Sequence, residues 1–539
     1  MVGFVAKEVL TLAPSYSATF RLCYNHLCGE MTTTFRPTTC CDEIVLQAAF
    51  SLPAELSLQE AYEHLPLHQS GSVVLDSSGE PSPAGNLSLA RYCMIAQEPF
   101  GTLEAHPQGA WWHSQEESRF ISGNPLRILQ EFLDRYSLPA RQYPVPLPAG
   151  ALGFLNYGLK ALIEPCPNRL PALNNLPLFW FGFYDAITTI DLHRRQVILT
   201  STGLPESGLM RCRRARQRLD ALVSRWQAIL GKASRPTVLP AFRCEKVCAL
   251  RTLTEYQRAL HQIKRYIADG DVYQVNLAQP FMARYEGSPF GLFLRARRVS
   301  PVPFGAYLQA GDFTIISLSP ERFVHLCPLT RRVHTRPIKG TRPRGRTHEE
   351  DSRHARELLA STKDRAEHIM IVDLERNDLG RVAQTGTVRV TELMTLEGFA
   401  QVYHLTSTVE ALLRPEVDTA QLLQAVFPGG SITGAPKIRA MQIIEEVEPV
   451  AREVYTGAVG YIGFHGGLDM NIAIRTAVLR TGSLTFYAGG GIVADSDIEQ
   501  EYEETIAKAR GWFEAIERFP ERGIDYAVGM EGRKTASSG

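Results

Sequence analysis

The stretch Phe427-Pro-Gly-Gly-Ser-Ile-Thr-Gly-Ala-Pro-Lys-Ile-Arg-Ala-Met441 joins a glycine-rich turn to the start of a predicted helix. We expect Pro436 to be the first helical residue, because its missing N–H would have no helical partner at that position. The free N–H groups of such a helix start attract anions. Ala435 stands where a phosphate-binding P-loop needs lysine, so that motif is excluded and a carboxylate ligand stays open. A plain tight turn before a helix is the alternative.

Two predicted helices flank this stretch, and each presents carboxylates three positions apart, which places them on one helix face. If the two faces meet, their mutual repulsion requires a cation, and oxygen ligands suit Mg²⁺. On spacing alone, solvated helix faces are the simpler interpretation, with Glu504 and Lys508 as an i,i+4 ion pair. The carboxylates are Asp364 and Glu367 on the helix around Lys363–Glu375, and Glu501 and Glu504 on the helix Ile498–Phe519.

A basic loop, Arg336–Gly345, carries Lys339 among several arginines. Like charges nearby would lower the pKa of the Lys339 amine and make it a nucleophile, whereas a solvated basic loop is the alternative. Glu321 follows an apolar strand and is a candidate general acid, although a structural carboxylate is the commoner explanation. His404 is a candidate for orienting a partner or moving a proton. Gly489–Gly491 would permit close approach of the backbone to a ligand.

Seven motifs occur in the order seen in the chorismate-utilising enzymes, and the chain resembles that family over about 246–520. The resemblance extends more weakly to an N-terminal lobe, through Leu75–Gly79 and Ala90–Ile95. It implies an α+β fold with a two-lobed, β-sandwich-like core of antiparallel sheets and helices packed outside. Seven ordered motifs are more specific than any one alone, so they favour the functional interpretations given above. The motifs are Ser319–Phe323, Pro337–Gly345, Lys363–Gly380, Phe427–Met441, Tyr455–Gly460, Ala473–Thr476 and Ala488–Thr505.

Two positions discriminate within the family that the chain resembles. Gln274 stands where isochorismate and salicylate synthases carry a lysine base, so activation of water at C2 lacks its base. Lys339 stands where anthranilate synthases typically carry alanine, and this is similar to the aminodeoxychorismate synthase branch. The resemblance therefore implies that chorismate and ammonia give 4-amino-4-deoxychorismate through a lysine adduct at C2, on the route to 4-aminobenzoate and folate. Anthranilate synthase component I and a non-catalytic regulatory subunit of the same fold are the alternatives.

The resemblance also implies a role for each candidate residue. The catalytic residues would be Lys339 as nucleophile, Glu321 as general acid, and His404. The Mg²⁺ ligands would be Glu367 and Glu504, with Glu501 and Asp364 close by. The substrate contacts would be Gln274, Gly340, Thr341, Gly434, Ala435, Tyr455, Arg475, Gly489 and Lys508.

The chain is expected to divide into five parts. They are a poorly organised N-terminal extension (1–43), an N-terminal lobe (44–232), a linker (233–245), a catalytic region (246–520) and a C-terminal tail (521–539). The predicted helix Ser207–Leu230 carries five arginines on one face, and we interpret that face as solvated. The helix that ends before Gly270 is expected to begin with a capping box at Thr254 and Gln257.

Composition limits the remaining classes of protein to which the chain could belong. The 539 residues contain 57 Lys and Arg against 57 Asp and Glu, and this neutral balance argues against a nucleic-acid binder. No apolar run approaches the roughly 18 residues of a membrane span, and Lys7 and Glu8 interrupt the apolar N-terminus, so we expect a cytoplasmic protein. No glutaminase motif is visible, so the resemblance implies ammonia from a separate glutamine amidotransferase. It leaves open a tryptophan in the N-terminal lobe.

Overall fold

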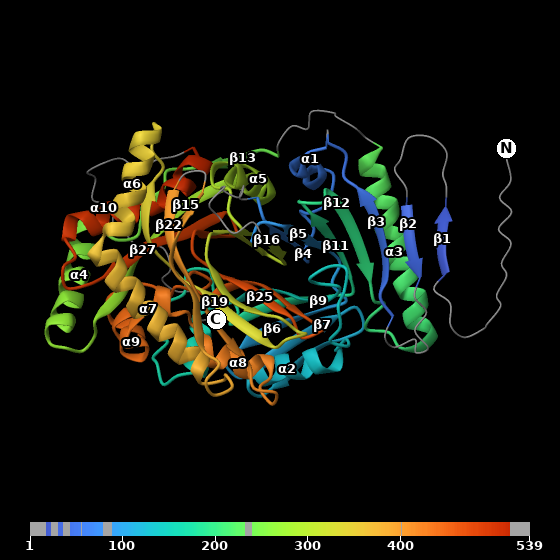
Figure 1. Cartoon of the computed structure of the whole chain (residues 1–539), viewed down its shortest axis with the longest axis horizontal. Helices are drawn as coiled ribbons and strands as arrows, with labels where there is room; N and C mark the ends of the chain where they lie inside the picture. Colours follow the sequence, from blue (N-terminus) through green and yellow to red (C-terminus); the bar gives the residue numbers. More distant parts are fainter. Residues whose placement is uncertain are drawn as a thin grey trace, which may run out of the picture.

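Two large antiparallel sheets form the core of the computed structural model (Figure 1). The structure describes the backbone of residues 18–22 and 31–35 and all of 44–54, 56–78, 89–231, 240–399 and 402–517. The predicted C-terminal tail, most of the predicted extension and part of the predicted linker lie outside these residues. Strands β1 (Ala18–Leu22) and β2 (Met31–Phe35) pair with each other as a separate antiparallel ribbon. The expected class of fold, antiparallel sheets with helices outside, is confirmed.

The first sheet has 12 strands in the order β20-β22-β19-β18-β25-β24-β9-β10-β6-β7-β8, with β21 also paired to β22. Its strands are β6 (Gly101–His106), β7 (Gly109–Ser114), β8 (Ser118–Ser122), β9 (Gly150–Leu155), β10 (Phe179–Tyr184), β18 (Arg322–Leu326), β19 (Arg332–Arg336), β20 (Ile338–Pro343), β21 (Arg389–Gly398), β22 (Val402–Leu412), β24 (Ala458–Gly463) and β25 (Leu468–Ile472).

The second sheet has 13 strands in the order β13-β15-β27-β26-β17-β16-β4-β5-β11-β12-β3, with β14 and β23 also paired to β15. Its strands are β3 (Leu46–Ser51), β4 (Ser72–Asp76), β5 (Tyr92–Ala96), β11 (Ala186–Asp191), β12 (Gln196–Ser201), β13 (Phe242–Cys244), β14 (Cys248–Ala249), β15 (Gln274–Gly287), β16 (Phe304–Ala310), β17 (Phe313–Ser319), β23 (Gly434–Ala435), β26 (Thr476–Arg480) and β27 (Ser483–Ile492). Both sheets combine strands from the N-terminal and C-terminal halves of the chain.

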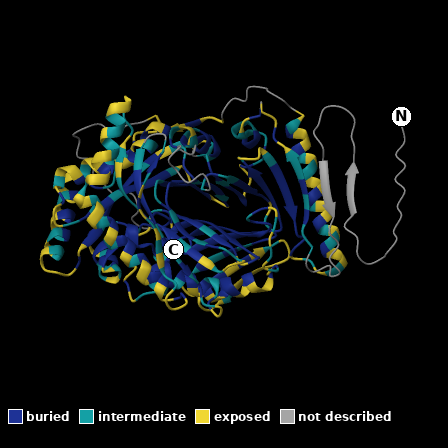
Figure 2. Cartoon of the chain, in the orientation of Figure 1, coloured by how far each residue is buried: buried dark blue, intermediate teal, exposed yellow. Residues whose placement is uncertain are grey.

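The helices cover the outer faces of the two sheets, and buried residues concentrate in the strands between them (Figures 1 and 2). One apolar cluster joins the facing sheets, for example Phe154 of β9 with Phe313 of β17. Strands covered on both sides are buried along their whole length, as β10 and β11 are, and β10 is also apolar throughout. The helices are α1 (Leu58–Glu63), α2 (Pro125–Arg135), α3 (Gly208–Leu230), α4 (Leu253–Ala268), α5 (Pro289–Val299), α6 (His348–Ala360), α7 (Thr362–Gly380), α8 (Thr419–Val426), α9 (Lys437–Val447) and α10 (Ile498–Ala515).

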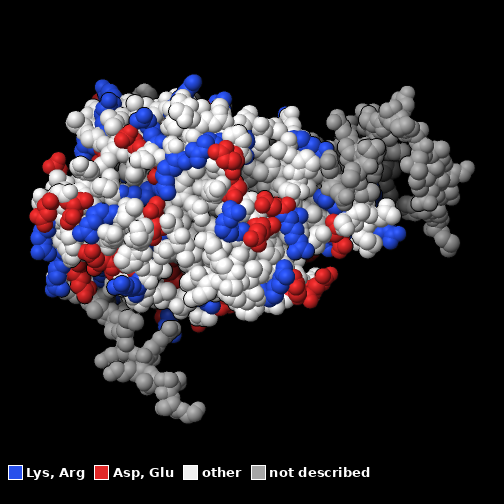
Figure 3. Space-filling model, turned by 90° about the horizontal axis from the view of Figure 1, so that it is seen from below, with Lys and Arg blue, Asp and Glu red and all other residues white. Residues whose placement is uncertain are grey.

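Two local predictions were wrong by one or two residues. Helix α4 begins with a capping box at Thr252 and Glu255, because the chain enters the helix two residues earlier than the apolar stripe suggested. Pro436 is the N-cap of α9 with an extended ψ of 139°, so the first helical residue is Lys437. Within the described parts of the chain, no helix combines the length and apolar character that crossing a bilayer requires. Positive and negative side chains are interspersed on the face in Figure 3.

Candidate active site

A cavity of about 1010 Å³ opens beside helices α7 and α10. Its walls also include the bulged strand β20, the adjoining ends of β15 and β27, and the turn that contains Ser431 and Ile432. Most of the sequence-predicted site residues line it: Glu321, Lys339, Gly340, Thr341, Asp364, Glu367, His404, Tyr455, Arg475, Gly489, Glu501, Glu504 and Lys508. Residues that lie far apart in the chain therefore meet at one place.

A bulge in β20 sets the direction of Lys339. The pairing with β22 shifts register between Lys339 and Thr341, and Gly340 between them has a φ of 75°. A Cβ added at Gly340 would lie 2.8 Å from Leu358 and 3.2 Å from Asp364, so only glycine fits without movement. Burial is the main cause that lowers the pKa of the Lys339 amine; the nearby Lys508 lowers it too, and Glu367 opposes the shift.

The arginines around Lys339 do not lower its pKa as we expected from the sequence. Each binds a carboxylate: Arg336 forms a buried ion pair with Glu397, Arg342 lies 3.0 Å from Asp364, and Arg344 lies 2.8 Å from Asp351. Their charges are therefore largely neutralised by these partners. Desolvation of the amine accounts for the lowered pKa in their place.

Glu321 lies just beyond the end of β17, buried in the wall of the cavity. Its Oε1 accepts a hydrogen bond of 2.6 Å from the Ser431 hydroxyl and one of 3.3 Å from the Ile338 N–H. Burial raises the pKa of this carboxyl to about 7, against the opposing effects of Ser431 and Lys339. A large share of Glu321 is therefore protonated near neutral pH, as a general acid requires.

Helices α7 and α10 bring four carboxylates into the cavity, namely Asp364, Glu367, Glu501 and Glu504. Burial raises the pKa of Glu367, and the neighbouring Asp364 and Glu501 raise it further. Lys508, 2.7 Å from Glu504, is the main cause that lowers the pKa of that carboxyl. Repulsion among like charges in a cavity is typical of a cation site.

These carboxylates fit a magnesium ion that is completed by other ligands. In the described parts of the chain, no group of three His, Cys, Asp or Glu side chains is close enough to hold a metal ion by itself. Mg²⁺ commonly uses only one or two protein carboxylates and takes the rest of its oxygen ligands from water and substrate. Glu367, Glu501 and Glu504 line the same cavity and could supply such carboxylate oxygens.

His404 lies on β22 opposite Thr341, with its Nδ1 2.9 Å from the Thr341 hydroxyl. Burial lowers the pKa of His404 to about 3, and Arg475 contributes to the shift. The imidazole is therefore neutral at physiological pH. Its hydrogen bond fixes the orientation of the Thr341 hydroxyl. A neutral imidazole has no proton to give as an acid at this pH.

Arg475 lies at one end of the cavity. None of the described carboxylates forms an ion pair with it, and burial lowers its pKa. Tyr455 lines the same cavity and stacks on Tyr487 with ring centroids 5.1 Å apart. Lys508 donates a 3.0 Å hydrogen bond to the Gly489 carbonyl. This end of the cavity suits an anionic ligand, since a buried cation favours an opposite charge.

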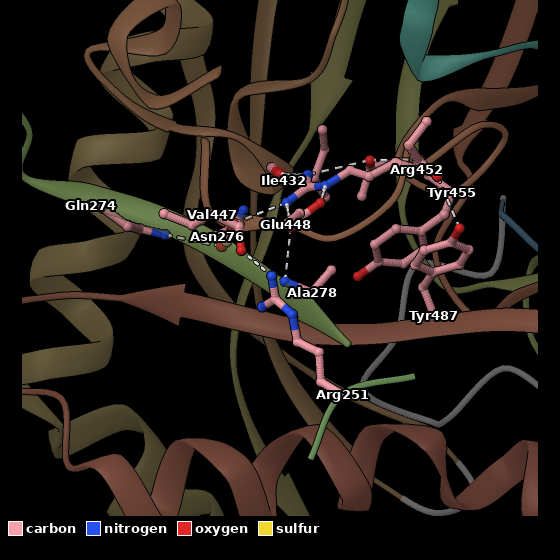
Figure 4. Close-up of polar contacts among 12 residues, drawn as sticks. Arg251, Gln274, Asn276, Ala278, Ile432, Val447, Glu448, Arg452, Tyr455 and Tyr487 are labelled. Carbon is pink, nitrogen blue, oxygen red and sulfur yellow. Dashed lines mark hydrogen bonds and ion pairs between the residues drawn. The ribbon is translucent and has the colours of Figure 1, made fainter. Parts of the chain in front are cut away.

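A buried ion pair that was not predicted from the sequence supports this wall (Figure 4). Arg452 and Glu448 lie 2.7 Å apart and are almost completely buried. Arg452 donates to the carbonyls of Ile432 and Asn276, and Glu448 accepts from the Ala278 N–H. The pair thus holds β15 against the turn at Ile432. An i,i+4 pair normally indicates an exposed helix surface, which is why sequence reasoning missed it.

Three predicted substrate residues lie behind the cavity wall. Gln274 pairs with Ala435 across β15 and β23, and neither they nor Gly434 line the cavity. Gly434 has a φ of 143°, and a Cβ there would lie 2.1 Å from the Gln274 carbonyl. The glycine turn therefore places Ser431 in the wall. Lys437, in the first turn of α9, forms an ion pair with Asp378.

The comparisons with known proteins agree with this geometry. The family model for chorismate binding enzymes matches residues 91–514. The chain is 39% identical over 465 residues to aminodeoxychorismate synthase component 1 of Klebsiella aerogenes, covering 86% of this chain and 97% of that protein. It is 38% identical over 408 residues to anthranilate synthase component 1 of Aquifex aeolicus (strain VF5), covering 74% of this chain and 80% of that one.

Two solved structures share the fold. The crystal structure of anthranilate synthase component I from Streptococcus pneumoniae TIGR4 has a TM-score of 0.69 at 30% identity and covers 86% of this chain and 98% of that one. MenF, the menaquinone-specific isochorismate synthase from Escherichia coli, has a TM-score of 0.63 at 18% identity over 88% and 94% of the two chains, which supports the fold alone. With the family match extending over most of the sequence and the predicted motifs meeting in one cavity, this chain belongs to the chorismate binding enzyme family.

Proposed function

We propose that this chorismate-utilising enzyme is the large subunit of an aminodeoxychorismate synthase. The observation that carries the proposal is the Lys339 amine in the wall of the cavity, desolvated and between Glu321 and the carboxylates of α7 and α10. A lysine with a lowered pKa is a nucleophile near neutral pH. Relatives named aminodeoxychorismate synthase component 1 support the same assignment.

The proposed reaction has two displacements. The neutral amine of Lys339 forms a bond to C2 of chorismate, the ring double bonds shift, and the C4 hydroxyl leaves as water with a proton from Glu321. Ammonia then forms a bond at C4 and returns one proton to Glu321, the double bonds shift back, and Lys339 leaves C2 as the free amine. The sum is chorismate plus ammonia giving 4-amino-4-deoxychorismate plus water. The raised pKa of Glu321 supports its role as the acid of the first step.

The anionic groups of chorismate would be held at two ends of the cavity. Arg475 and Tyr455 would bind the enolpyruvyl carboxylate with the Gly489 backbone, because a guanidinium without a partner suits a carboxylate. Thr341, held by His404, would orient the ring. Lys508 would add positive charge between the two ends. Gly340 would shape the backbone around Lys339, whereas Gly434 and Ala435 would support the cavity wall from behind.

Mg²⁺ would be held by Glu367 and Glu504, with Glu501 and Asp364 close by. When bound, the ion would neutralise the ring carboxylate and fix the ring relative to the protein. Helices α7 and α10 hold these carboxylates in place beside Lys339. Ammonia would come from a separate glutamine amidotransferase, because the relatives are named as one component of a synthase. A tryptophan in the N-terminal lobe stays a prediction.

The position of the new amino group tests the proposal. The chain is incubated with chorismate, Mg²⁺ and ¹⁵N-ammonium, and the products are separated and identified by mass spectrometry and NMR. We expect the label at C4. A label only at C2 would identify an anthranilate synthase, the second candidate, which several relatives at similar identity favour and which Lys339 disfavours. Unchanged chorismate under all conditions would favour the non-catalytic alternative.

A further inference from the structure

Lys363 occupies an electrostatically unfavourable position. It is the second residue of α7, where the free N–H groups carry partial positive charge and the next residue, Asp364, is the type that such a position favours. A lysine is disfavoured there unless another interaction compensates it. Lys363 lines the cavity, so the compensating charges lie in the site itself.

The compensating charges are the carboxylates assigned above to Mg²⁺. The Lys363 amine lies 3.6 Å from Oε1 of Glu501, whose side chain is 5% exposed. Its positive charge also opposes the rise in the pKa of Glu367 and contributes to the lowered pKa of Glu504. One amine therefore acts on three carboxylates that come from two helices.

Three of the four carboxylates already have a cation nearby. Asp364 lies 3.0 Å from Arg342, Glu501 lies 3.6 Å from Lys363, and Glu504 lies 2.7 Å from Lys508. A divalent ion that binds Glu501 or Glu504 would compete with the amine already beside it. The affinity for the metal therefore depends on how firmly that amine is held.

Lys363 is the cation that can leave most easily. Its side chain is 49% exposed and makes one ion pair of 3.6 Å on a flexible stem. Lys508 is held twice, by Glu504 and by the Gly489 carbonyl. Lys339 is only partly buried, but its amine is desolvated in the wall of the cavity.

We infer that Lys363 is a displaceable internal counter-ion: it pairs with Glu501 beside the proposed Mg²⁺ ligands in the metal-free protein, and it competes with Mg²⁺ for this group of carboxylates. The inference rests on the proposed function, since it takes its metal site from there. It makes Lys363 a positioning residue that lowers the affinity for free Mg²⁺, so that the ion is held firmly only when the substrate brings further negative charge.

The experiment measures Mg²⁺ binding to the full chain without chorismate by isothermal titration calorimetry. Lys363→Met should bind Mg²⁺ about fivefold more tightly, as expected from the loss of one half-exposed competing charge. Lys363→Arg keeps the charge and should bind as the wild type does. Arg365→Met is the matched control, because it removes a cation from the same turn of α7 but its side chain does not line the cavity. It should leave the affinity unchanged.

Thermal unfolding gives a second measurement of the same variants. Without metal, Lys363→Met should unfold at a lower temperature than Arg365→Met, and Mg²⁺ should raise its midpoint by more than that of the wild type. Unchanged or weaker Mg²⁺ binding in Lys363→Met would overturn the inference. Glu367→Gln separates the two proposals. If it binds Mg²⁺ as well as the wild type, the metal site itself is wrong; if it loses binding while Lys363→Met does not gain any, only the role of Lys363 is wrong.

Discussion

Helices α3 and α10 look alike in sequence, since each carries a row of charged residues, but their charges meet different partners. On α3, Arg214 and Arg218 lie 3.2 Å and 3.4 Å from the buried Asp185. On α10, Glu501 and Glu504 face other carboxylates across a cavity. The arginines of α3 pair with a carboxylate inside the packed fold, whereas on α10 carboxylates and lysines gather around a cavity. Charged groups that meet in a cavity, not a row of charges on a helix, indicate the functional site.

The comparison also corrects the interpretation of α3 as a solvated face. Arg211 is 5% exposed and donates a 2.9 Å hydrogen bond to the Thr202 carbonyl. Arg218 also forms an ion pair with Glu98. These arginines fasten α3 to the outer face of the second sheet, so they belong to the fold and need no nucleic acid.

The largest effect is expected at Lys339. Lys339→Ala should lower formation of 4-amino-4-deoxychorismate by at least about 1000-fold, because the covalent step has no other amine in place. Any residual turnover should give the C2-amino product, since ammonia can then enter where lysine stood. Product separation by chromatography measures both.

The matched control is Lys264→Ala, a lysine of α4 that binds the Ser496 carbonyl outside the cavity. Its product yield should equal that of the wild type. Wild-type yield of the C4 product from Lys339→Ala would remove the covalent role. Such a result would mean that ammonia displaces the C4 hydroxyl at this site without a lysine adduct.

The next effect concerns stability, because the charges of α3 are expected to stabilise the fold and those of α10 to serve activity. Asp185→Asn should lower the free energy of unfolding by about 3 kcal/mol, because two arginines then face a buried side chain without charge. Turnover at low temperature should stay close to that of the wild type. Chemical denaturation and a product assay measure the two quantities. Asp220→Asn, in an exposed i,i+4 pair with Arg216, should change neither; a stable Asp185→Asn variant would show that the α3 contacts contribute little.

The third effect compares two faces of one helix. Glu504→Gln should lower turnover by about 100-fold and raise the Mg²⁺ concentration needed for activity, because a proposed ligand loses its charge. Glu503→Gln changes the neighbouring exposed residue, which does not line the cavity, and should have no effect. Steady-state rates against Mg²⁺ concentration give the comparison. Equal losses of turnover in both variants would mean that the substitutions act by destabilising α10 and not by removing a metal ligand.

Sequence reasoning predicted local elements well and their surroundings poorly. The helices α7 and α10 and the carboxylates on each face follow from spacing, but their meeting depends on two sheets that combine strands from both halves of the chain. The resemblance supplied that step. The Arg452–Glu448 pair and the hydroxyl of Ser431 could not be predicted, because an i,i+4 pair and a turn serine have the same pattern on a surface. Burial alone distinguishes them, and burial is set by tertiary structure.

The smallest effect tests the acid in the cavity wall. Glu321 must be protonated to release the C4 hydroxyl, and its pKa is about 7. The alkaline limb of kcat/KM should therefore begin near pH 7 and fall about tenfold per pH unit above it. The Ser431 hydrogen bond stabilises the ionised carboxylate and lowers this pKa. Its loss in Ser431→Ala should move the alkaline limb to higher pH, while Ser431→Thr keeps a hydroxyl and should restore the wild-type position. A limb that does not move in Ser431→Ala would assign the titration to another group.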